Sequence, residues 1–128
     1  MRKIKFRGIV EKERDKWNNA GKFAYGYLLQ DFNGDYMIAT LTDTSHGVIY
    51  QYVDRDTVGQ FTGLYDKNGV EIYDGDRVKT PNTKDAKVCF SNSAYGYYDK
   101  YNYWHYISED ELEVIENIHD KEETNNVG

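Results

Sequence analysis

Three histidines and one cysteine are the residues of this chain best suited to acid–base or nucleophilic chemistry. His46, His105 and His119 lie far apart in the sequence and have no evident partners near them. A nucleophile needs an adjacent base, and a metal needs several ligands at suitable spacing. Cys89 alternates within a strand pattern, which is typical of a small buried hydrophobe. The sequence therefore predicts no catalytic residue, no metal site and no cofactor.

Several aspartates stand beside glycines. Asp74 and Asp76 flank Gly75 and would need further ligands to form a metal or acid–base site. Asp66 opens the run Asp66-Lys67-Asn68-Gly69, in which the glycine comes too early for a calcium loop. Aspartate side chains accept backbone hydrogen bonds in turns, and glycine adopts positive φ there. These aspartates are predicted to hold tight turns.

The strongest candidate for a binding surface is an aromatic cluster near the C-terminal end. Its residues are Tyr95, Tyr97, Tyr98, Tyr101, Tyr103 and Trp104, followed by Tyr106. A strand points alternate side chains to opposite faces, so about half of these rings cannot enter one core. Protein interfaces favour exposed tyrosine and tryptophan. The alternative is a sheet whose second face is covered by the N-terminal half of the chain.

Positive charge is concentrated at the start of the chain. Residues 1–22 hold eight basic and three acidic side chains, whereas residues 106–128 hold one basic and eight acidic side chains. The whole chain has a net charge of −6. The candidate phosphate-contacting residues are Arg2, Lys3, Lys5 and Arg7. Phosphate affinity comes from clustered lysine and arginine, but the solvated face of an edge strand has the same composition. Within the aromatic cluster the only cation is Lys100, which argues against a stacking platform for nucleic acid.

The fold class follows from periodicity. Alternation with a period of two dominates the 128 residues, and no long helical period occurs, which predicts a mainly β chain built as a small barrel or pair of sheets. The spacing Ser108–Glu111 predicts one short helical turn. No run of 18 apolar residues and no apolar leader is present, so no membrane association is expected. A single cysteine fits a reducing cytoplasm.

Specific strands and turns can also be placed. Ile4, Phe6 and Val10 alternate with lysine and arginine, which predicts a first strand with one buried and one charged face. Asn33-Gly34 predicts a two-residue hairpin loop, and Asn68-Gly69 a second hairpin. Ala86–Phe90 is expected to form one strand, with Val88 and Phe90 on the same face. Tyr95–Tyr106 is expected to form two strands around Asp99-Lys100.

A long central motif resembles the signature of the YopX family of phage and prophage proteins. Residues 53–78 read VDRDTVGQFTGLYDKNGVEIYDGDRV, and the segments Ile4–Gly8, Tyr25–Leu28 and Leu112–Ile118 are similar to the family pattern as well. Arg55 stands where the family usually has proline, and Glu116 where it usually has glycine. The resemblance implies a C-terminal half similar to an SH3-type barrel, and it implies no activity.

Together these features predict a mainly β protein of small antiparallel sheets, with an N-terminal β region (1–57), a C-terminal SH3-like barrel (58–120) and a flexible tail (121–128), unless the halves intertwine as one domain. The expected function is that of a non-enzymatic accessory protein, cytoplasmic in a bacterial host. It would bind a host or phage protein, or itself as a homo-oligomer. The alternative is a nucleic-acid-associated protein that uses the basic N-terminal strand.

Overall fold

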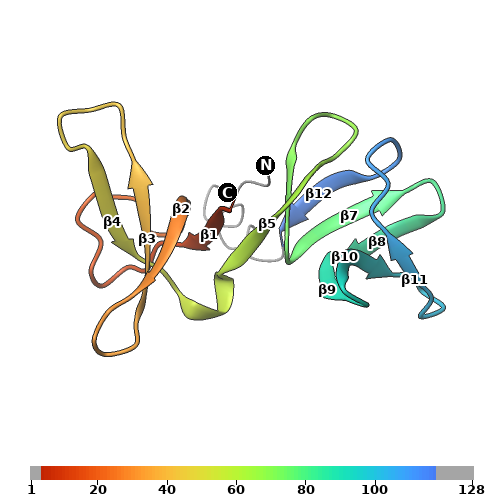
Figure 1. Cartoon of the computed structure of the whole chain (residues 1–128), viewed down its shortest axis with the longest axis horizontal. Coiled ribbons are helices and arrows are strands. Elements are labelled where there is room, and N and C mark those ends of the chain that lie inside the picture. Colours follow the sequence, from red (N-terminus) through yellow and green to blue (C-terminus); the bar gives the residue numbers. More distant parts are fainter. Residues whose placement is uncertain (1–3, 118–128) are drawn as a thin grey trace, which may run out of the picture. The chain divides into compact units, whose positions relative to one another are not determined.

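Almost all regular structure in the described part of the chain is β-strand. The computed structural model describes residues 4–117 (Figure 1). Its strands are β1 (Phe6–Ile9), β2 (Phe23–Gln30), β3 (Tyr36–Leu41), β4 (Val48–Tyr52), β5 (Gly59–Tyr65), β6 (Glu71–Tyr73), β7 (Asp76–Thr80), β8 (Thr83–Lys87), β9 (Cys89–Ser91), β10 (Ala94–Tyr98), β11 (Trp104–Tyr106) and β12 (Glu113–Asn117). The 3-10 turn η1 (Arg55–Thr57) is short, and within residues 4–117 no helix has the length and apolar character needed to cross a membrane. The predicted mainly β class is confirmed.

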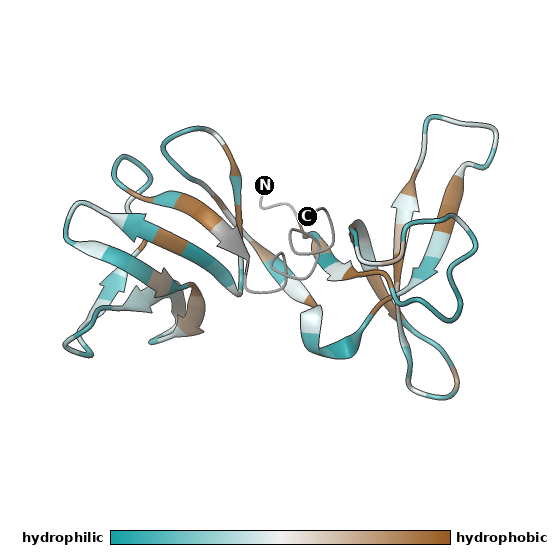
Figure 2. Ribbon diagram, turned by 180° about the vertical axis from the view of Figure 1, so that it is seen from behind, coloured by the Kyte–Doolittle hydropathy of each residue, from teal (hydrophilic) through white to brown (hydrophobic). Residues whose placement is uncertain are grey.

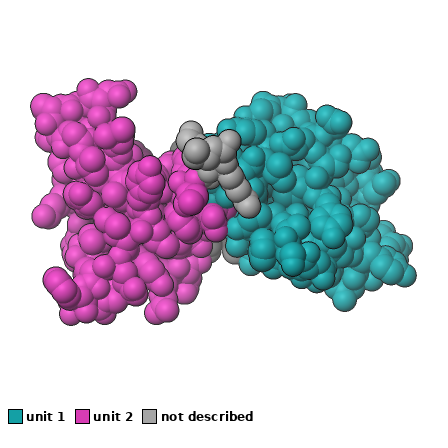
Figure 3. Space-filling view, viewed as in Figure 1, with its two compact units in different colours: residues 1–2, 61–121 teal, residues 3–60, 122–128 magenta. Residues whose placement is uncertain are grey.

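The described chain divides into two compact units, residues 4–60 and 61–117 (Figure 3). The sequence placed the boundary after residue 57, which is the last residue of η1. In the structure Gly59 and Gln60 of β5 pair with β1 and belong to the N-terminal unit. The rest of β5 belongs to the C-terminal unit. Each unit is described by itself below.

The N-terminal unit is an antiparallel sheet in the order β4-β3-β2-β1-β5. Its core consists of Val10, Ala24, Ile38 and Val53, against which Phe6, Leu28, Tyr36 and Val58 pack. Strand β2 reaches this core through Ala24 and Leu28, whereas Tyr25 and Tyr27 point to the opposite, exposed face. Tyr27 is 68% exposed, which makes it a useful reference for an accessible tyrosine outside the predicted site.

The prediction for the first strand is wrong in three respects. Strand β1 is not an edge strand, because it pairs with β2 on one side and with β5 on the other. Arg7 is only 6% exposed, and its guanidinium carbon lies 4.4 Å from the centre of the Phe23 ring. Ile4, expected inside, is exposed. Pairing on both sides places Arg7 over its neighbours on the sheet instead of in solvent.

The C-terminal unit contains the three-stranded sheets β11-β10-β9 and β12-β7-β8, together with the β5–β6 hairpin. Its core residues are Ile72, Val78, Ala86, Val88, Tyr97 and Leu112. Hydrophobic residues lie along the strands and hydrophilic residues fill most connecting loops (Figure 2). None of the sheets in residues 4–117 closes into a barrel, so the SH3-like detail is not confirmed.

The single strand expected over Ala86–Phe90 is instead two strands in different sheets. Strand β8 ends at Lys87 in the sheet with β7, and β9 begins at Cys89 in the sheet with β10. At the transition the Val88 N–H donates to the Asp76 carbonyl at 2.9 Å. Because the chain changes sheet there, Val88 is fully buried while Phe90 is exposed.

Three hairpin turns share one pattern, and each begins with an aspartate. The backbone N–H of Asp31, Asp66 and Asp99 donates to the carbonyl four residues later, at 2.8–3.0 Å. In each turn the aspartate Oδ1 accepts the N–H groups two and four residues later. The residue three positions after the aspartate has positive φ: 87° at Gly34, 80° at Gly69 and 66° at Asn102.

This pattern confirms the hairpin predicted at Asn68-Gly69 and the structural role predicted for Asp66. It corrects the two-residue loop predicted at Asn33-Gly34, because only Gly34 has positive φ and the turn spans residues 31–35. The predicted short helical turn is also present, since the Ser108 carbonyl accepts from the N–H groups of Glu111 and Leu112.

Candidate functional site

The predicted aromatic cluster folds into the β10–β11 hairpin of the C-terminal unit. Tyr97 pairs with His105, Tyr98 with Trp104, and Gly96 with Tyr106. Because alternate residues of a strand point to opposite faces, this register divides the cluster into two sets. Tyr98, Trp104 and Tyr106 share one face of the hairpin, and Tyr97 and His105 share the other.

Two of the predicted interaction residues serve the core. Tyr97 is 7% exposed and belongs to the core cluster, and Tyr95 packs against that cluster as a partly buried ring. The His105 ring stacks on Tyr97 with centroids 5.1 Å apart and planes 15° apart. Tyr97 therefore does not form part of an accessible surface.

On the opposite face, Tyr98, Trp104 and Tyr106 form a continuous row of rings. The Trp104 centroid lies 4.9 Å from that of Tyr98 and 6.2 Å from that of Tyr106, with interplanar angles of 61° and 83°. Gly96 makes this row possible, because a Cβ there would lie 2.2 Å from the His105 carbonyl oxygen and 2.7 Å from Trp104 Cζ2. The Trp104 ring consequently packs directly over backbone.

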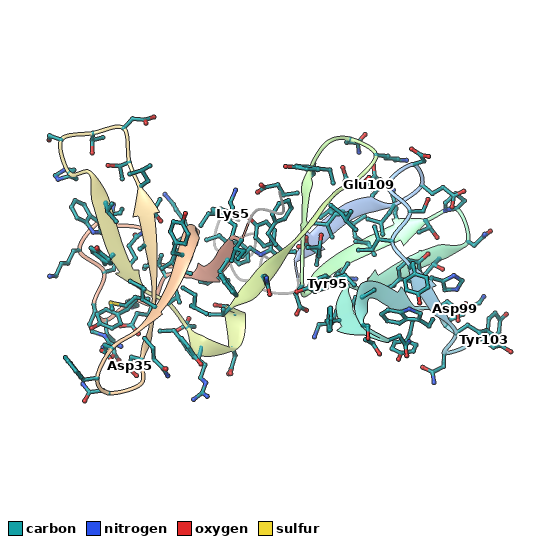
Figure 4. All side chains as sticks on the ribbon, in the orientation of Figure 1. Lys5, Asp35, Tyr95, Asp99, Tyr103 and Glu109 are labelled. Carbon is teal, nitrogen blue, oxygen red and sulfur yellow. The ribbon has the colours of Figure 1, made fainter. Side chains whose placement is uncertain are left out.

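The hairpin tip carries the two most exposed rings of the cluster. Tyr101 is 70% exposed and Tyr103 is 69% exposed. Their backbone N–H groups donate to Asp99 Oδ1 at 2.9 and 3.0 Å, so the aspartate turn fixes the backbone from which both rings project. Asp99 and Tyr103 are labelled at the end of this hairpin in Figure 4. We call Tyr98, Tyr101, Tyr103, Trp104 and Tyr106 the tyrosine surface.

His105 has a partner that the sequence did not reveal. Its Nε2 lies 2.7 Å from Asp99 Oδ2, across the hairpin from the turn. The hydrogen bond from His105 is the main cause that lowers the pKa of Asp99 below its ordinary value, and the Tyr103 N–H adds to it. An Asp–His pair can orient an imidazole for proton transfer. Here the imidazole is stacked on Tyr97, and the pair braces the turn.

The other histidines do not join this site. His46 makes an edge-on contact with Trp17, at 4.7 Å between ring centroids, in the N-terminal unit. His119 lies outside the described residues.

An open groove of ≈ 500 Å³ adjoins the tyrosine surface within the C-terminal unit. Its apolar lining consists of Leu64, Phe90, Tyr95, Tyr106 and Ile107, and Thr62 and Ser93 contribute hydroxyl groups. None of the residues that line the groove is charged. Sequence inspection missed the groove because β5, the β9–β10 hairpin and the end of β11 are far apart in the chain. Tyr106 belongs to both the groove and the ring row.

Two further candidates for chemistry, Asp76 and Cys89, lie in the C-terminal unit. Asp76 is buried, and its Oδ2 accepts the Tyr73 N–H at 2.8 Å. Burial, and secondly the charge of Asp74, raises the pKa of the Cys89 thiol, which disfavours the reactive thiolate. Over residues 4–117, no three His, Cys, Asp or Glu side chains are grouped so that they could hold a metal ion.

Of the four candidate phosphate-contacting residues, the structure describes Lys5 and Arg7, and neither is a fully exposed cation. Arg7 is buried, and Lys5 is half-buried with its Nζ 5.8 Å from the centre of the Tyr25 ring. Lys5 is labelled on the N-terminal unit in Figure 4. Arg2 and Lys3 lie outside the described residues.

These features define a mainly antiparallel β protein of two small units, with an exposed aromatic hairpin on the second. The family model described as YopX protein matches residues 5–124. The chain belongs to the YopX family. A search of curated proteins gives no match. Among solved structures the chain is similar to the crystal structure of protein EF1440 from Enterococcus faecalis, with 20% identity, a TM-score of 0.47, and coverage of 97% of this chain and 99% of that one.

Proposed function

We propose that this protein is a non-enzymatic protein-interaction module that binds its partner through the tyrosine surface. The observation that carries the proposal is the exposure of Tyr101, Tyr103 and Tyr106 on a hairpin whose backbone is fixed by Asp99. Tyrosine and tryptophan contribute a large contact area with few rotatable bonds, so little conformational entropy is lost when they are buried by a partner.

Charge favours a protein partner over nucleic acid. Residues 61–117 hold eleven acidic and six basic side chains, and the only cation of the hairpin is Lys100, whose Nζ lies 5.1 Å from the Tyr101 ring centroid. A stacking platform for single strands needs interleaved cations to neutralise phosphate. The alternative site on β1 has less support because Arg7 is buried.

Affinity capture with three baits tests the proposal: the wild-type chain, a Tyr101→Ala/Tyr103→Ala variant, and Tyr27→Ala as the matched control. The double variant removes two exposed rings of the tyrosine surface, and the control removes an equally exposed ring from the other unit. We expect a bacterial or phage protein, or a second copy of this chain, to be retained by the wild type and the control and lost from the double variant.

Two further conditions distinguish the classes of partner. Retention through the rings should persist when salt is raised from about 0.1 M to about 0.5 M and after nuclease treatment, because it does not depend on phosphate contacts. Retention that disappears under either condition, or that is equal for the double variant and the control, would contradict the proposal. Light scattering at micromolar concentration identifies the case in which the partner is a second copy.

A further inference from the structure

We propose that the groove beside the tyrosine surface binds an extended, proline-containing peptide segment that carries a basic residue next to its prolines. This inference rests on the proposed function and names the chemistry of the partner. It is carried by the aromatic lining of the groove, by the absence of charge from that lining, and by an acidic hollow formed by residues next to it in the chain.

The lining of the groove suits prolyl rings. Phe90 and Tyr106 are 58% and 63% exposed, and the Phe90 ring meets the Tyr95 ring edge-on at 5.0 Å between centroids. Tyr106 is in turn nearly perpendicular to Trp104. The exposed faces of Phe90 and Tyr106 offer flat apolar area on which a rigid prolyl ring can pack. Aromatic-lined grooves of this kind bind polyproline II segments, which lose little entropy because the free peptide already adopts that conformation.

A second hollow lies close to the groove in the chain, because its lining residues follow groove residues within one to three positions. It measures ≈ 310 Å³ and is lined by Tyr65, Asp66, Lys67, Glu109 and Asp110. Leu64 of the groove is followed directly by Tyr65 of the hollow, and Ile107 is separated from Glu109 by one residue. Within the hollow, Glu109 contacts Tyr65, because one of its carboxylate oxygens accepts the Tyr65 N–H at 2.8 Å. Figure 4 labels Tyr95 of the groove and Glu109 of the hollow.

Charge complementarity fixes the second feature of the peptide. The hollow contains three carboxylates and one lysine, and the oxygens of Asp66 already accept backbone N–H groups from Asn68, Val70 and Val114. Glu109 and Asp110 thus supply the negative charge that a ligand would meet. A peptide whose prolines occupy the neutral groove would place an adjacent arginine or lysine at these two side chains, where opposite charge fixes the register of binding.

Neither a nucleic acid nor an acidic peptide has these properties. A nucleic acid would stack its bases on the rings but would bring its phosphates to the carboxylates of the hollow. An acidic peptide would meet the same repulsion. A basic, proline-containing segment complements both the uncharged aromatic groove and the acidic hollow.

Three synthetic peptides of about ten residues, ~30 Å long in the polyproline II conformation, test this inference on the full chain. The first has repeated prolines and an arginine at each end, the second has every proline replaced by alanine, and the third has each arginine replaced by glutamate. We expect the first peptide to bind, as measured by isothermal titration calorimetry, and each of the other two to bind at least about tenfold more weakly.

Single-residue variants test whether the peptide binds at the groove and at the acidic hollow. Tyr106→Ala should weaken the first peptide by about tenfold or more, because truncating an aromatic anchor is costly at an interface. Glu109→Gln keeps an acceptor for the Tyr65 N–H and should weaken the arginine peptide severalfold, without affecting an otherwise identical peptide whose ends are glutamine. Tyr27→Ala should change nothing.

The inference is overturned if the proline peptide binds no better than the alanine peptide, or if Tyr106→Ala behaves as Tyr27→Ala does. That result would leave the proposed function separately testable, because the capture experiment depends on Tyr101 and Tyr103 at the hairpin tip. Capture that succeeds while all peptides fail would mean that the partner presents a folded surface. Loss of both would contradict the proposed function as well.

Discussion

The turns at Asp66 and Asp99 have the same backbone hydrogen bonds but differ in what holds the second carboxylate oxygen. Asp66 Oδ2 accepts the N–H of Val114, at 2.9 Å, from a strand 48 residues later in the chain. Asp99 Oδ2 lies 2.7 Å from His105 of its own hairpin. The first turn connects the β5–β6 hairpin to β12, whereas the contacts of the Asp99 carboxylate with residues 4–117 all come from its own hairpin.

The side chains of the two turns differ accordingly. Asp66 is 5% exposed, and its turn includes the asparagine–glycine pair typical of tight hairpins. The Asp99 turn has Tyr101 and Asn102 at the equivalent positions, and it exposes Tyr101 and Tyr103. The same local chemistry thus serves two purposes: the Asp66 turn stabilises the fold, and the Asp99 turn presents aromatic rings on a fixed backbone.

Replacing the two aspartates should have the largest and most unequal effects. Asp66→Ala removes the acceptor of three backbone N–H groups at a buried site, which should cost about 3 kcal/mol and lower the Tm by on the order of 10 °C. Asp99→Ala should lower the Tm much less, because its turn is open to water that can replace the carboxylate. Thermal unfolding by circular dichroism measures both. Equal losses of stability would mean that the two turns do not differ in role.

Substitutions at the positive-φ residue of each turn should differ in magnitude. At Gly69, with φ of 80°, a Cβ would meet nothing within 4 Å, so Gly69→Val tests backbone strain alone. We expect a loss of about 2 kcal/mol and a Tm several degrees lower, because β-branched residues tolerate this region least. Asn102→Gly should change stability by less than about 0.5 kcal/mol, since asparagine already tolerates the conformation. A Gly69→Val melt within about a degree of the wild type would show that the turn assignment is wrong.

The Asp99 turn should respond to acid. Its carboxyl has a pKa lowered from 3.8, chiefly by the hydrogen bond from His105. Below pH 3.8 the unfolded chain binds a proton at this residue before the folded chain does, so the stabilisation present above that pH is lost as pH falls through the lowered pKa. His105→Phe keeps a ring against Tyr97 and should raise the pKa of Asp99 toward 3.8. A carboxyl NMR titration measures this change, and an unaltered Asp99 pKa in the variant would exclude His105 as the main cause.

The smallest effect on stability should come from the exposed rings. Tyr101→Ala and Tyr103→Ala should each change the free energy of unfolding by less than about 0.5 kcal/mol, because surface substitutions away from packed features are nearly neutral. The same substitutions should abolish partner binding. Denaturant unfolding of the capture baits provides the measurement. A large loss of stability would mean that these side chains support the fold and do not serve primarily as contact residues.

Local patterns predicted the strands and turns that depend on neighbouring residues. The two strands around Asp99-Lys100 and the hairpin at Asn68-Gly69 follow from alternation and turn chemistry, and both are present. The prediction of a single strand over Ala86–Phe90 was wrong because the chain passes from one sheet to another at Val88. The prediction of a charged face on β1 was wrong because strands pair with β1 on both sides and Arg7 is buried among them. Alternation with a period of two does not indicate how many neighbouring strands a strand has.

The candidate site was predictable in composition but not in arrangement. The sequence identified the tyrosine cluster, and the alternation of side chains along a strand predicted that its rings divide between two faces. It could not assign Tyr97 to the core, since that depends on the register with β11. The Asp99–His105 pair and the groove could not be found either, because they join residues across a hairpin and across distant strands. The recurring aspartate turn was detectable as an aspartate followed three residues later by glycine or asparagine.

Hydrogen–deuterium exchange of the chain, alone and with its captured partner, tests the central claim most directly. Both units expose tyrosines on a sheet, so the experiment compares residues 94–106 with residues 23–30. The account predicts slower exchange in residues 94–106 when the partner is bound and no change in residues 23–30. Protection confined to residues 23–30 would contradict it and would assign binding to the exposed face of β2.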